Sequence, residues 1–389
     1  MRQGEVTNID IIRPSILKYA LDDALSVKLS DFDYDLPKEL IAQEPLAKRD
    51  ASRMLVLDGK KISHRSFSDF PGYLEKGDVL VLNNTLVFPA RLAGKRETGG
   101  KVELLVLRNE GERAEALVRA KPLRPGETIS ITGGKCEVVK RIEGARYQLD
   151  FSVPGGISGY LDRHGTMPTP PYVKKKLESP ERYQTVFARN RGSVAAPTAG
   201  MHFTPELLDG IRARGVTVAF VTLHIGPGTF QPVKALDVEG HKMEPEYYQV
   251  PEETAKAVNG RKGRLVAVGT TVVKTLESAA RLVAGNGSDA RDGAGLHDGG
   301  SLTPTADGSS RKGGRLVASE GWSDLFIHPG HEFRLRPDML LTNFHLPRST
   351  LIMLISAYAG RERILAACAE AVREKYRFYS FGDSMLCLS

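Results

Sequence analysis

Residues 216–230 read Val-Thr-Val-Ala-Phe-Val-Thr-Leu-His-Ile-Gly-Pro-Gly-Thr-Phe, and this stretch decides the fold class. The apolar, β-branched run at 216–223 predicts a buried strand, and the two glycines after it predict a loop. The same order recurs at 265–268 and at 339–342, each followed by a polar loop. Strands that alternate with loops and helical patterns predict an α/β domain, in which ligands lie beyond the carboxyl ends of the strands.

Helical patterns follow two of these loops, and the first backbone N–H groups of a helix attract anions. The loop side chains near such an anion are His224, Thr270, Thr271, His345, Arg348 and Ser349. This edge of the sheet is therefore expected to hold a carboxylate or a phosphate.

A second stretch of small residues, 191–204, reads Arg-Gly-Ser-Val-Ala-Ala-Pro-Thr-Ala-Gly-Met-His-Phe-Thr. Small side chains let a backbone approach a ligand closely. Thr204 and Pro205 predict the start of a helix just after His202. A plain connector with a partly buried histidine explains the same residues equally well.

Residues 91–156 differ from the rest of the chain in their pattern of short strand-like runs and turns. Strand-like runs occupy 101–108, 114–120, 128–131, 135–142 and 146–151. Turn pairs such as Pro125-Gly126 separate them at even spacing, which predicts a small antiparallel β-barrel inserted into the α/β domain. The α/β domain then comprises 27–90 and 157–389. A nucleic-acid platform and a purely structural module both fit such a barrel.

The chain is basic, and one connector concentrates the charge. A formal net charge of +7 over 389 residues favours contact with a polyanion, although a diffuse positive surface gives the same value. Pro170 and Pro171 interrupt regular structure, and cations then alternate with aromatic residues. The residues expected to bind the phosphates of a nucleic acid are Lys174, Lys175, Lys176, Arg182, Arg189 and Arg191. A solvated charged loop is the alternative.

Composition argues against several classes of protein. Hydrophobic residues make up 41% of the chain, but no apolar run reaches the ~18 residues that a membrane helix needs. Three cysteines lie far apart and no secretory signal is visible, which favours a cytoplasmic protein. Residues 1–26 are expected to be an N-terminal extension. The Gly/Ser/Asp-rich tract 285–314 is expected to be a disordered surface loop.

Familiar cofactor signatures are absent. No Gly-x-Gly-x-x-Gly follows a strand, which argues against an ordinary dinucleotide-binding or methyltransferase Rossmann domain. There is no Walker loop and no His-Glu-x-x-His. His328 and His331 have no carboxylate or cysteine partner nearby in sequence, so no metal site is expected.

Two motifs are specific enough to indicate a family. They are Ala-Ala-Pro-Thr-Ala-Gly-Met-His-Phe-Thr at 195–204 and His-Ile-Gly-Pro-Gly-Thr-Phe at 224–230. Further motifs are Leu-Ser-Asp-Phe-Asp-Tyr at 29–34, Tyr-Gln-Thr-Val at 183–186, Gly-Thr-Thr at 269–271, Thr-Asn-Phe-His-Leu-Pro at 342–347 and Gly-Asp-Ser-Met at 382–385. Over about residues 27–388 the chain resembles the S-adenosylmethionine:tRNA ribosyltransferase-isomerase family of queuosine biosynthesis.

The resemblance implies a mixed α/β catalytic domain with an inserted β-barrel, and an unusual reaction. S-adenosylmethionine is a substrate that donates its ribosyl carbons rather than its methyl group. The implied acceptor is the aminomethyl group of a 7-deazaguanine at the tRNA wobble position, and adenine and methionine leave. The product is epoxyqueuosine in tRNA. A monomer that needs neither a metal nor a redox cofactor is expected.

The implied chemistry needs proton transfer, because a base removes a C5′ proton beside the sulfonium and adenine leaves with a proton or a hydrogen bond. The proton-transfer candidates are His202, His224 and His345, with Asp383 as an orienting carboxylate. The substrate-binding candidates are Thr198, Gly200, Gly226, Gly228, Thr229, Thr270, Thr271 and Arg348.

Two positions depart from the family pattern. His331 stands where an aromatic residue, usually Tyr, is expected, and Glu244 stands where many relatives carry His. Two other functions remain open: a non-catalytic RNA-binding protein, and an ordinary S-adenosylmethionine-dependent RNA methyltransferase, which the missing glycine motif disfavours.

Overall fold

The computed structural model describes residues 27–175, 177–230, 238–284 and 314–388. The predictions made for 1–26, for Lys176 and for 285–313 concern residues outside these ranges. Among the described residues, no helix is both long and apolar enough to cross a membrane.

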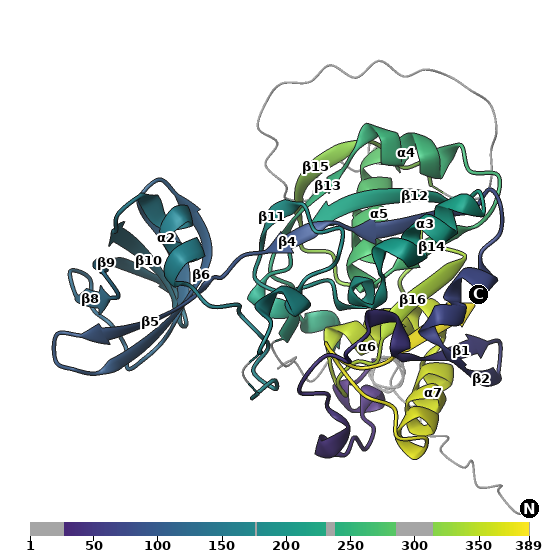
Figure 1. The fold of residues 1–389 in the computed structure, drawn as a ribbon, viewed down its shortest axis with the longest axis horizontal. Helices are drawn as coiled ribbons and strands as arrows, with labels where there is room; N and C mark the ends of the chain where they lie inside the picture. The colour runs from purple at the N-terminus through teal and green to yellow at the C-terminus, as the bar shows by residue number, and fades with distance from the viewer. Residues whose placement is uncertain (1–26, 176, 231–237, 285–313, 389) are drawn as a thin grey trace, which may run out of the picture.

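A nine-stranded sheet forms the centre of the α/β domain, in the order β15-β13-β12-β3-β14-β16-β17-β1-β2 (Figure 1). Its strands are β1 (Arg53–Asp58), β2 (Lys61–Ser66), β3 (Val79–Asn83), β12 (Thr217–Leu223), β13 (Glu246–Val250), β14 (Leu265–Val268), β15 (Ser319–Ser323), β16 (Met339–Asn343) and β17 (Ser384–Leu388). The central strands β12, β3, β14 and β16 run parallel, whereas β17 runs antiparallel to β16. The apolar runs seen in the sequence therefore supply the parallel core of the sheet, as predicted.

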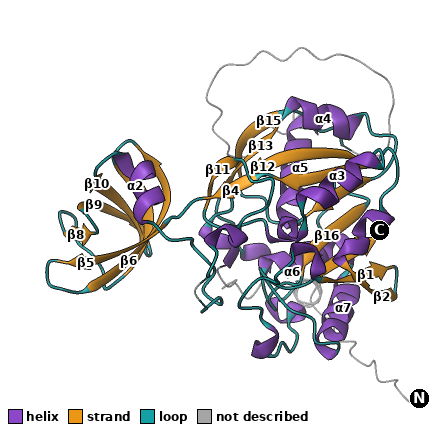
Figure 2. Cartoon of the chain, viewed as in Figure 1, coloured by secondary structure: helices purple, strands orange, loops and turns teal. Residues whose placement is uncertain are grey.

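Helices cover both faces of this sheet (Figure 2), so its central strands are buried on both sides. Val79 and Val81 belong to the core formed with α4 (Glu252–Asn259), α5 (Thr270–Ala284), α6 (Thr350–Ala359) and α7 (Arg361–Arg373). The alternate residues Leu80 and Leu82 face the opposite side. They pack with α3 (Pro205–Ala213) and the short 3-10 helix η4 (Phe67–Tyr73).

Two helix starts have the caps that the sequence predicted. The Thr204 hydroxyl accepts a hydrogen bond from the Leu207 N–H at 3.1 Å, and Pro205 is the first residue of α3. The Ser349 hydroxyl accepts from the Ile352 N–H at 3.3 Å at the start of α6. Each cap satisfies a backbone donor that the helix itself leaves unpaired.

The barrel forms a separate lobe beside the α/β domain (Figure 1). Six antiparallel strands close it in the order β10-β7-β6-β5-β8-β9. They are β5 (Arg91–Arg96), β6 (Lys101–Glu110), β7 (Arg113–Arg119), β8 (Thr128–Ile131), β9 (Gly134–Glu143) and β10 (Arg146–Ser152). The predicted fold class, a mixed α/β domain with a small antiparallel β-barrel, is confirmed.

One helix of the barrel lobe was not predicted. Helix α2 (Gly156–His164) follows the last barrel strand, and its residues Ile157, Tyr160 and Leu161 are buried in the barrel's own hydrophobic core. The expected boundary at residue 156 separates this helix from the strands it packs on. We therefore propose that the inserted domain extends to residue 164.

Candidate active site

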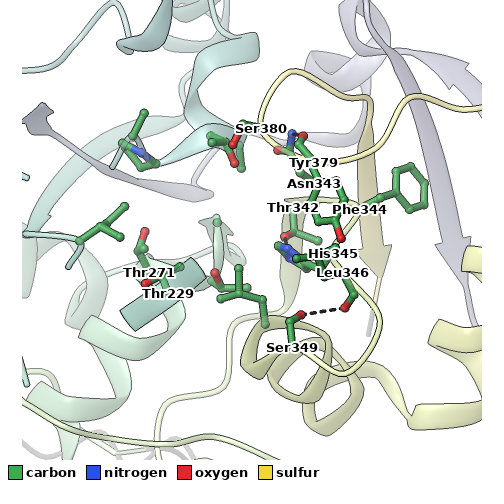
Figure 3. A pocket seen from close by; sticks show the side chains of 18 of the residues that line it. Thr229, Thr271, Thr342, Asn343, Phe344, His345, Leu346, Ser349, Tyr379 and Ser380 are labelled. Carbon is green, nitrogen blue, oxygen red and sulfur yellow. Dashed lines mark hydrogen bonds between the residues drawn. The ribbon is translucent and has the colours of Figure 1, made fainter. Parts of the chain in front are cut away.

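A cavity of about 660 Å³ opens at the edge of the sheet where the parallel strands β14 and β16 end. We call it the central cavity. In Figure 3, Thr229 and Thr271 lie on one side of it, and residues 342–346, Ser349, Tyr379 and Ser380 lie on the other. The predicted site residues that line it are Thr198, Thr229, Thr270, Thr271 and His345. Ligand space therefore lies beyond the carboxyl ends of the strands, as expected for an α/β domain.

His345 is the candidate histidine that lines the central cavity. Its Nε2 lies 2.8 Å from the Thr342 hydroxyl, and its backbone carbonyl accepts a hydrogen bond from the Tyr34 hydroxyl. Burial disfavours the charged form and lowers the pKa of His345 to about 3. The side chain is therefore a neutral imidazole at pH 7, oriented by Thr342.

Two helix N-termini meet at the central cavity. Thr270 and Thr271 begin α5, while Ser349 caps α6, and all three line the cavity. Gly269 has a φ of +88°, a conformation that favours glycine and turns the chain from β14 into α5. Asn83 fixes this turn, because its side-chain amide donates to the Thr271 hydroxyl at 3.2 Å. The partial positive charge of the two helix ends suits a carboxylate.

A buried ion pair that the sequence analysis missed anchors another cavity loop. Glu246 lies 2.9 Å from the Lys274 ammonium, and both side chains are 7% exposed. The same carboxylate accepts from the Gly226 N–H at 3.0 Å and from the Thr229 hydroxyl at 3.2 Å. Gly226 therefore binds Glu246 rather than lining the cavity, and Thr229 is held where it does line it. Lys274 lies in the helix that the sequence predicted from Val272 onward, but no sequence pattern pointed to Glu246 as its partner.

His202 lies beside the central cavity and lines a second, smaller pocket. Its Nδ1 is 2.8 Å from the Ser52 hydroxyl, and its ring stacks on Phe67 at 4.9 Å. Burial lowers the pKa of His202 to about 4, although the nearby Asn343 side chain opposes this shift. His202 is therefore neutral at pH 7. It lies next to Asn343, which lines the central cavity.

His224 lies outside both pockets. Its Nδ1 is 2.8 Å from the Thr85 hydroxyl, and its ring stacks on Tyr247 at 5.4 Å. A side chain at Gly192 would bring Cβ within 2.5 Å of the imidazole, so this glycine makes room for the ring. Burial lowers the pKa of His224 as well. In this structure the histidine packs between two strands.

Asp383 is buried and does not line either pocket. One carboxylate oxygen accepts from the Arg53 N–H at 2.9 Å and the other from the Arg377 N–H at 2.8 Å. Burial raises the pKa of Asp383, and these hydrogen bonds oppose that shift. The carboxylate ties the loop that carries Tyr379 and Ser380 to the start of β1.

Three other substrate-binding candidates do not line the central cavity. A Cβ at Gly200 would lie 2.8 Å from the Phe187 ring, and one at Gly228 would lie 3.3 Å from a carboxylate oxygen of Glu244, so packing accounts for both glycines. Arg348 is exposed and forms an ion pair with Asp33.

Three of the predicted phosphate-binding residues, Lys174, Lys175 and Arg182, form hydrogen bonds to the segment 43–47. Lys175 pairs with Glu44, and Arg191 pairs with Asp162 at 2.7 Å. Arg182 lines the second pocket. The remaining described members of the set, Lys174 and Arg189, are exposed.

Aromatic and amide residues of the cavity wall were missed as site residues. Tyr172 and Tyr379 stack with ring centroids 4.6 Å apart, and the Tyr172 hydroxyl is 2.7 Å from the Ser380 hydroxyl. The Asn343 amide donates to the Tyr379 carbonyl at 2.9 Å. Asn343 lies within one of the family motifs quoted above, so that motif was the available signal. Tyr172 directly follows Pro170 and Pro171, in the basic connector that was predicted to contact phosphates.

The two residues that depart from the family pattern each have a side-chain partner, an arginine for Glu244 and a glutamate for His331. Glu244 lies 2.9 Å from Arg146 of the barrel strand β10, so it links the two domains. His331 Nε2 lies 3.2 Å from Glu277, which also accepts from the Arg334 and Leu335 N–H groups. In the described part of the chain, no group of three or more His, Cys, Asp or Glu residues is arranged to hold a metal ion.

The fold and site define an α/β enzyme with an inserted barrel, whose cavity joins helix N-termini to a neutral histidine. A model of the family described as queuosine biosynthesis protein matches residues 29–387. The chain therefore belongs to the queuosine biosynthesis protein family.

Two curated relatives agree with this assignment. Curated proteins named S-adenosylmethionine:tRNA ribosyltransferase-isomerase are 47% identical in Pelotomaculum thermopropionicum and 50% identical in Symbiobacterium thermophilum. Each alignment covers 93% of this chain and 100% of the relative. A solved structure of S-adenosylmethionine tRNA ribosyltransferase from Thermotoga maritima is 35% identical, covers 92% of this chain and 100% of that one, and has a TM-score of 0.49.

Proposed function

We propose that the chain transfers and isomerises the ribosyl group of S-adenosylmethionine onto the 7-aminomethyl-7-deazaguanine at the wobble position of a tRNA. The names and high coverage of its relatives support this activity. We place the reaction in the central cavity because two helix N-termini and a neutral histidine line it. Adenine and methionine leave, and the tRNA gains epoxyqueuosine.

The cavity offers complementary surfaces to each part of S-adenosylmethionine. The N-termini of α5 and α6, at Thr270 and Ser349, suit the methionine carboxylate. The stacked rings of Tyr172 and Tyr379 lie in the wall, and aromatic faces stabilise a cation such as the sulfonium. Ile225 and Leu346 add apolar surface for the adenine.

Proton transfer falls to His345 in this proposal. Its neutral imidazole takes the C5′ proton, and the imidazolium then gives that proton to the departing adenine. A pKa of about 3 makes the imidazolium a strong acid for the second transfer and the imidazole a weak base for the first. His202 and Asp383 act as positioning residues, because they hold the walls that carry Asn343 and Ser380.

The proposed reaction needs no redox cofactor, because the conversion of S-adenosylmethionine and the amine into the epoxide, adenine and methionine involves no net oxidation or reduction. The absence of a metal stays a prediction. The monomeric state and the cytoplasmic location expected from the sequence stay predictions.

Product analysis tests the proposed function. With S-adenosylmethionine and a tRNA that carries the aminomethyl base, the protein should release adenine and methionine in equal amounts, with EDTA present. A tRNA with plain guanine at the wobble position is the control and should stop the release. S-adenosylhomocysteine would indicate a methyltransferase instead, and tRNA binding without any product would indicate a non-catalytic RNA-binding protein.

A further inference from the structure

The second pocket, which we call the basic pocket, encloses about 320 Å³ and shares Ser380 with the central cavity. Three cationic side chains line it, from Lys48, Arg49 and Arg182, and its lining includes no Asp or Glu. A concave surface with cations and no carboxylate has the chemistry of an anion site.

Backbone carbonyls, not carboxylates, hold the two guanidinium groups. Arg49 donates to the carbonyls of Met201 at 3.1 Å and Glu181 at 3.4 Å. Arg182 donates to the carbonyls of residues 46–47 at 2.7 and 3.0 Å. Each arginine thus anchors the segment that carries the other, and both are positioned before any ligand arrives. Neither forms an ion pair with a residue in the described ranges.

Carboxylates balance the positive charge around this pocket only in part, because Asp383 and Glu44 act on Arg377 but not on Arg49. Burial, together with the charge of Arg182, lowers the pKa of Arg49. Arg377 is half-buried near His202, and burial lowers its pKa too. Nε of Arg182 and one terminal nitrogen of Arg377 are buried without a hydrogen-bond acceptor among the described residues. An anion in the pocket would relieve this repulsion.

We propose that the basic pocket binds a backbone phosphate of the tRNA, next to the nucleotide whose base reacts in the central cavity. This inference rests on the proposed function. The pocket adjoins the central cavity at Ser380, so a base in one and its neighbouring phosphate in the other are compatible. Guanidinium groups bind phosphate oxygens in paired hydrogen bonds, and such contacts fix the register of an RNA.

The methionine carboxylate of S-adenosylmethionine is the other anion that the reaction supplies. It has a place at the N-termini of α5 and α6 inside the central cavity. Lys48, by contrast, is exposed at the basic pocket, as suits a polyanion that approaches from solvent. The arrangement therefore favours the RNA phosphate.

The variants Arg49→Gln and Arg182→Gln test the proposal, with Arg65→Gln as the matched control, because Arg65 is exposed on β2 away from both pockets. We expect each pocket variant to bind tRNA about tenfold to a hundredfold more weakly, as lost charge-assisted hydrogen bonds predict. The slope of log K against log[salt] should shrink by about 0.7–0.9 per lost phosphate contact. Affinity for S-adenosylmethionine, measured by calorimetry without tRNA, should stay unchanged.

A second arm changes the RNA instead of the protein. One anticodon stem-loop carries a neutral methylphosphonate beside the wobble nucleotide, and the other carries the normal phosphate. The wild type should bind the methylphosphonate stem-loop more weakly than the normal one. The variant Arg49→Gln should bind both stem-loops equally well. This arm decides the matter if a glutamine variant fails to fold.

Weaker S-adenosylmethionine binding with unchanged tRNA binding would overturn the proposal in favour of the carboxylate. Unchanged binding of both would show that the pocket holds no anion. Adenine release by the wild type is measured separately, so a failure of the proposed function is distinguished from a failure of the phosphate site.

Discussion

Replacing Lys274 by methionine tests whether the buried ion pair with Glu246 holds the cavity loop in place. The substitution keeps the length of the side chain but removes its charge. It leaves a carboxylate that is 7% exposed, and the donors that remain to it among the described residues are the Gly226 N–H and the Thr229 hydroxyl. Breaking a buried pair in this way costs about 3–5 kcal/mol, so the free energy of unfolding should fall by that amount.

The pair also makes a double-mutant prediction. Glu246→Gln should be similarly destabilising, because it leaves the Lys274 ammonium buried without its counter-ion. The double variant Lys274→Met/Glu246→Gln carries no buried charge, so it should lose much less than the sum of the two single losses. Urea unfolding followed by circular dichroism measures all four proteins. A loss below about 1 kcal/mol in Lys274→Met, or strict additivity in the double variant, would refute the electrostatic account.

The other predictions concern pH, catalysis and a helix cap. The unfolded chain protonates His202 and His345 at the ordinary pKa of 6.5, but the folded chain does so at about 4 and 3. Stability present above pH 6.5 is therefore lost as the pH falls, by about 1 kcal/mol per histidine between pH 6.5 and 5.5. The substitution His202→Gln should make the free energy of unfolding depend less steeply on pH. In single-turnover assays, His345→Ala should lower the rate by about 10²–10⁴-fold, whereas His224→Ala should lower it by less than about tenfold. If His224→Ala had the larger effect, His345 would not be the proton-transfer residue. Thr204→Ala removes the α3 cap and should cost about 1 kcal/mol in urea unfolding, and no loss at all would contradict the hydrogen bond seen there.

Local signals in the sequence predicted the parallel core and the barrel. The runs at 265–268 and 339–342 are buried on both faces of the sheet, so every residue in them is apolar or nearly so. Barrel strands alternate buried and exposed residues between turn pairs, as β7 does. Both patterns depend on near neighbours in the chain, which is why they can be read without a structure.

Edge strands and the helix α2 had no such signal. The outermost strand β15 reads Ser-Glu-Gly-Trp-Ser, and it forms because β13 offers a pairing edge rather than because of its own composition. Glycines at 156 and 159 disfavour a helix, and α2 forms because Tyr160 and Leu161 are buried in the barrel core. Tertiary packing decides both elements.

The sequence predicted the candidate site only in part, because local motifs do not show how distant segments pack together. Motif residues that follow strands, such as Thr271 and His345, do reach the central cavity. His224 and Asp383 belong to equally specific motifs but do not line the cavity, and neither does Arg348, which directly follows one of the motifs. A motif shows that a residue matters, whereas only the packed structure shows which way its side chain faces. The contact between Glu246 and Lys274 joins a strand to a helix 28 positions away, so no local pattern could reveal it.

The most direct test of the central claim follows the atoms of S-adenosylmethionine. The substrate should carry ¹³C in its ribosyl carbons and deuterium in its methyl group, and the tRNA should carry the aminomethyl-deazaguanine. After reaction, mass spectrometry of the digested tRNA should find the ¹³C label on the wobble nucleoside and the deuterium on free methionine. Deuterium on the tRNA with no ¹³C would mean methyl transfer and would contradict the account.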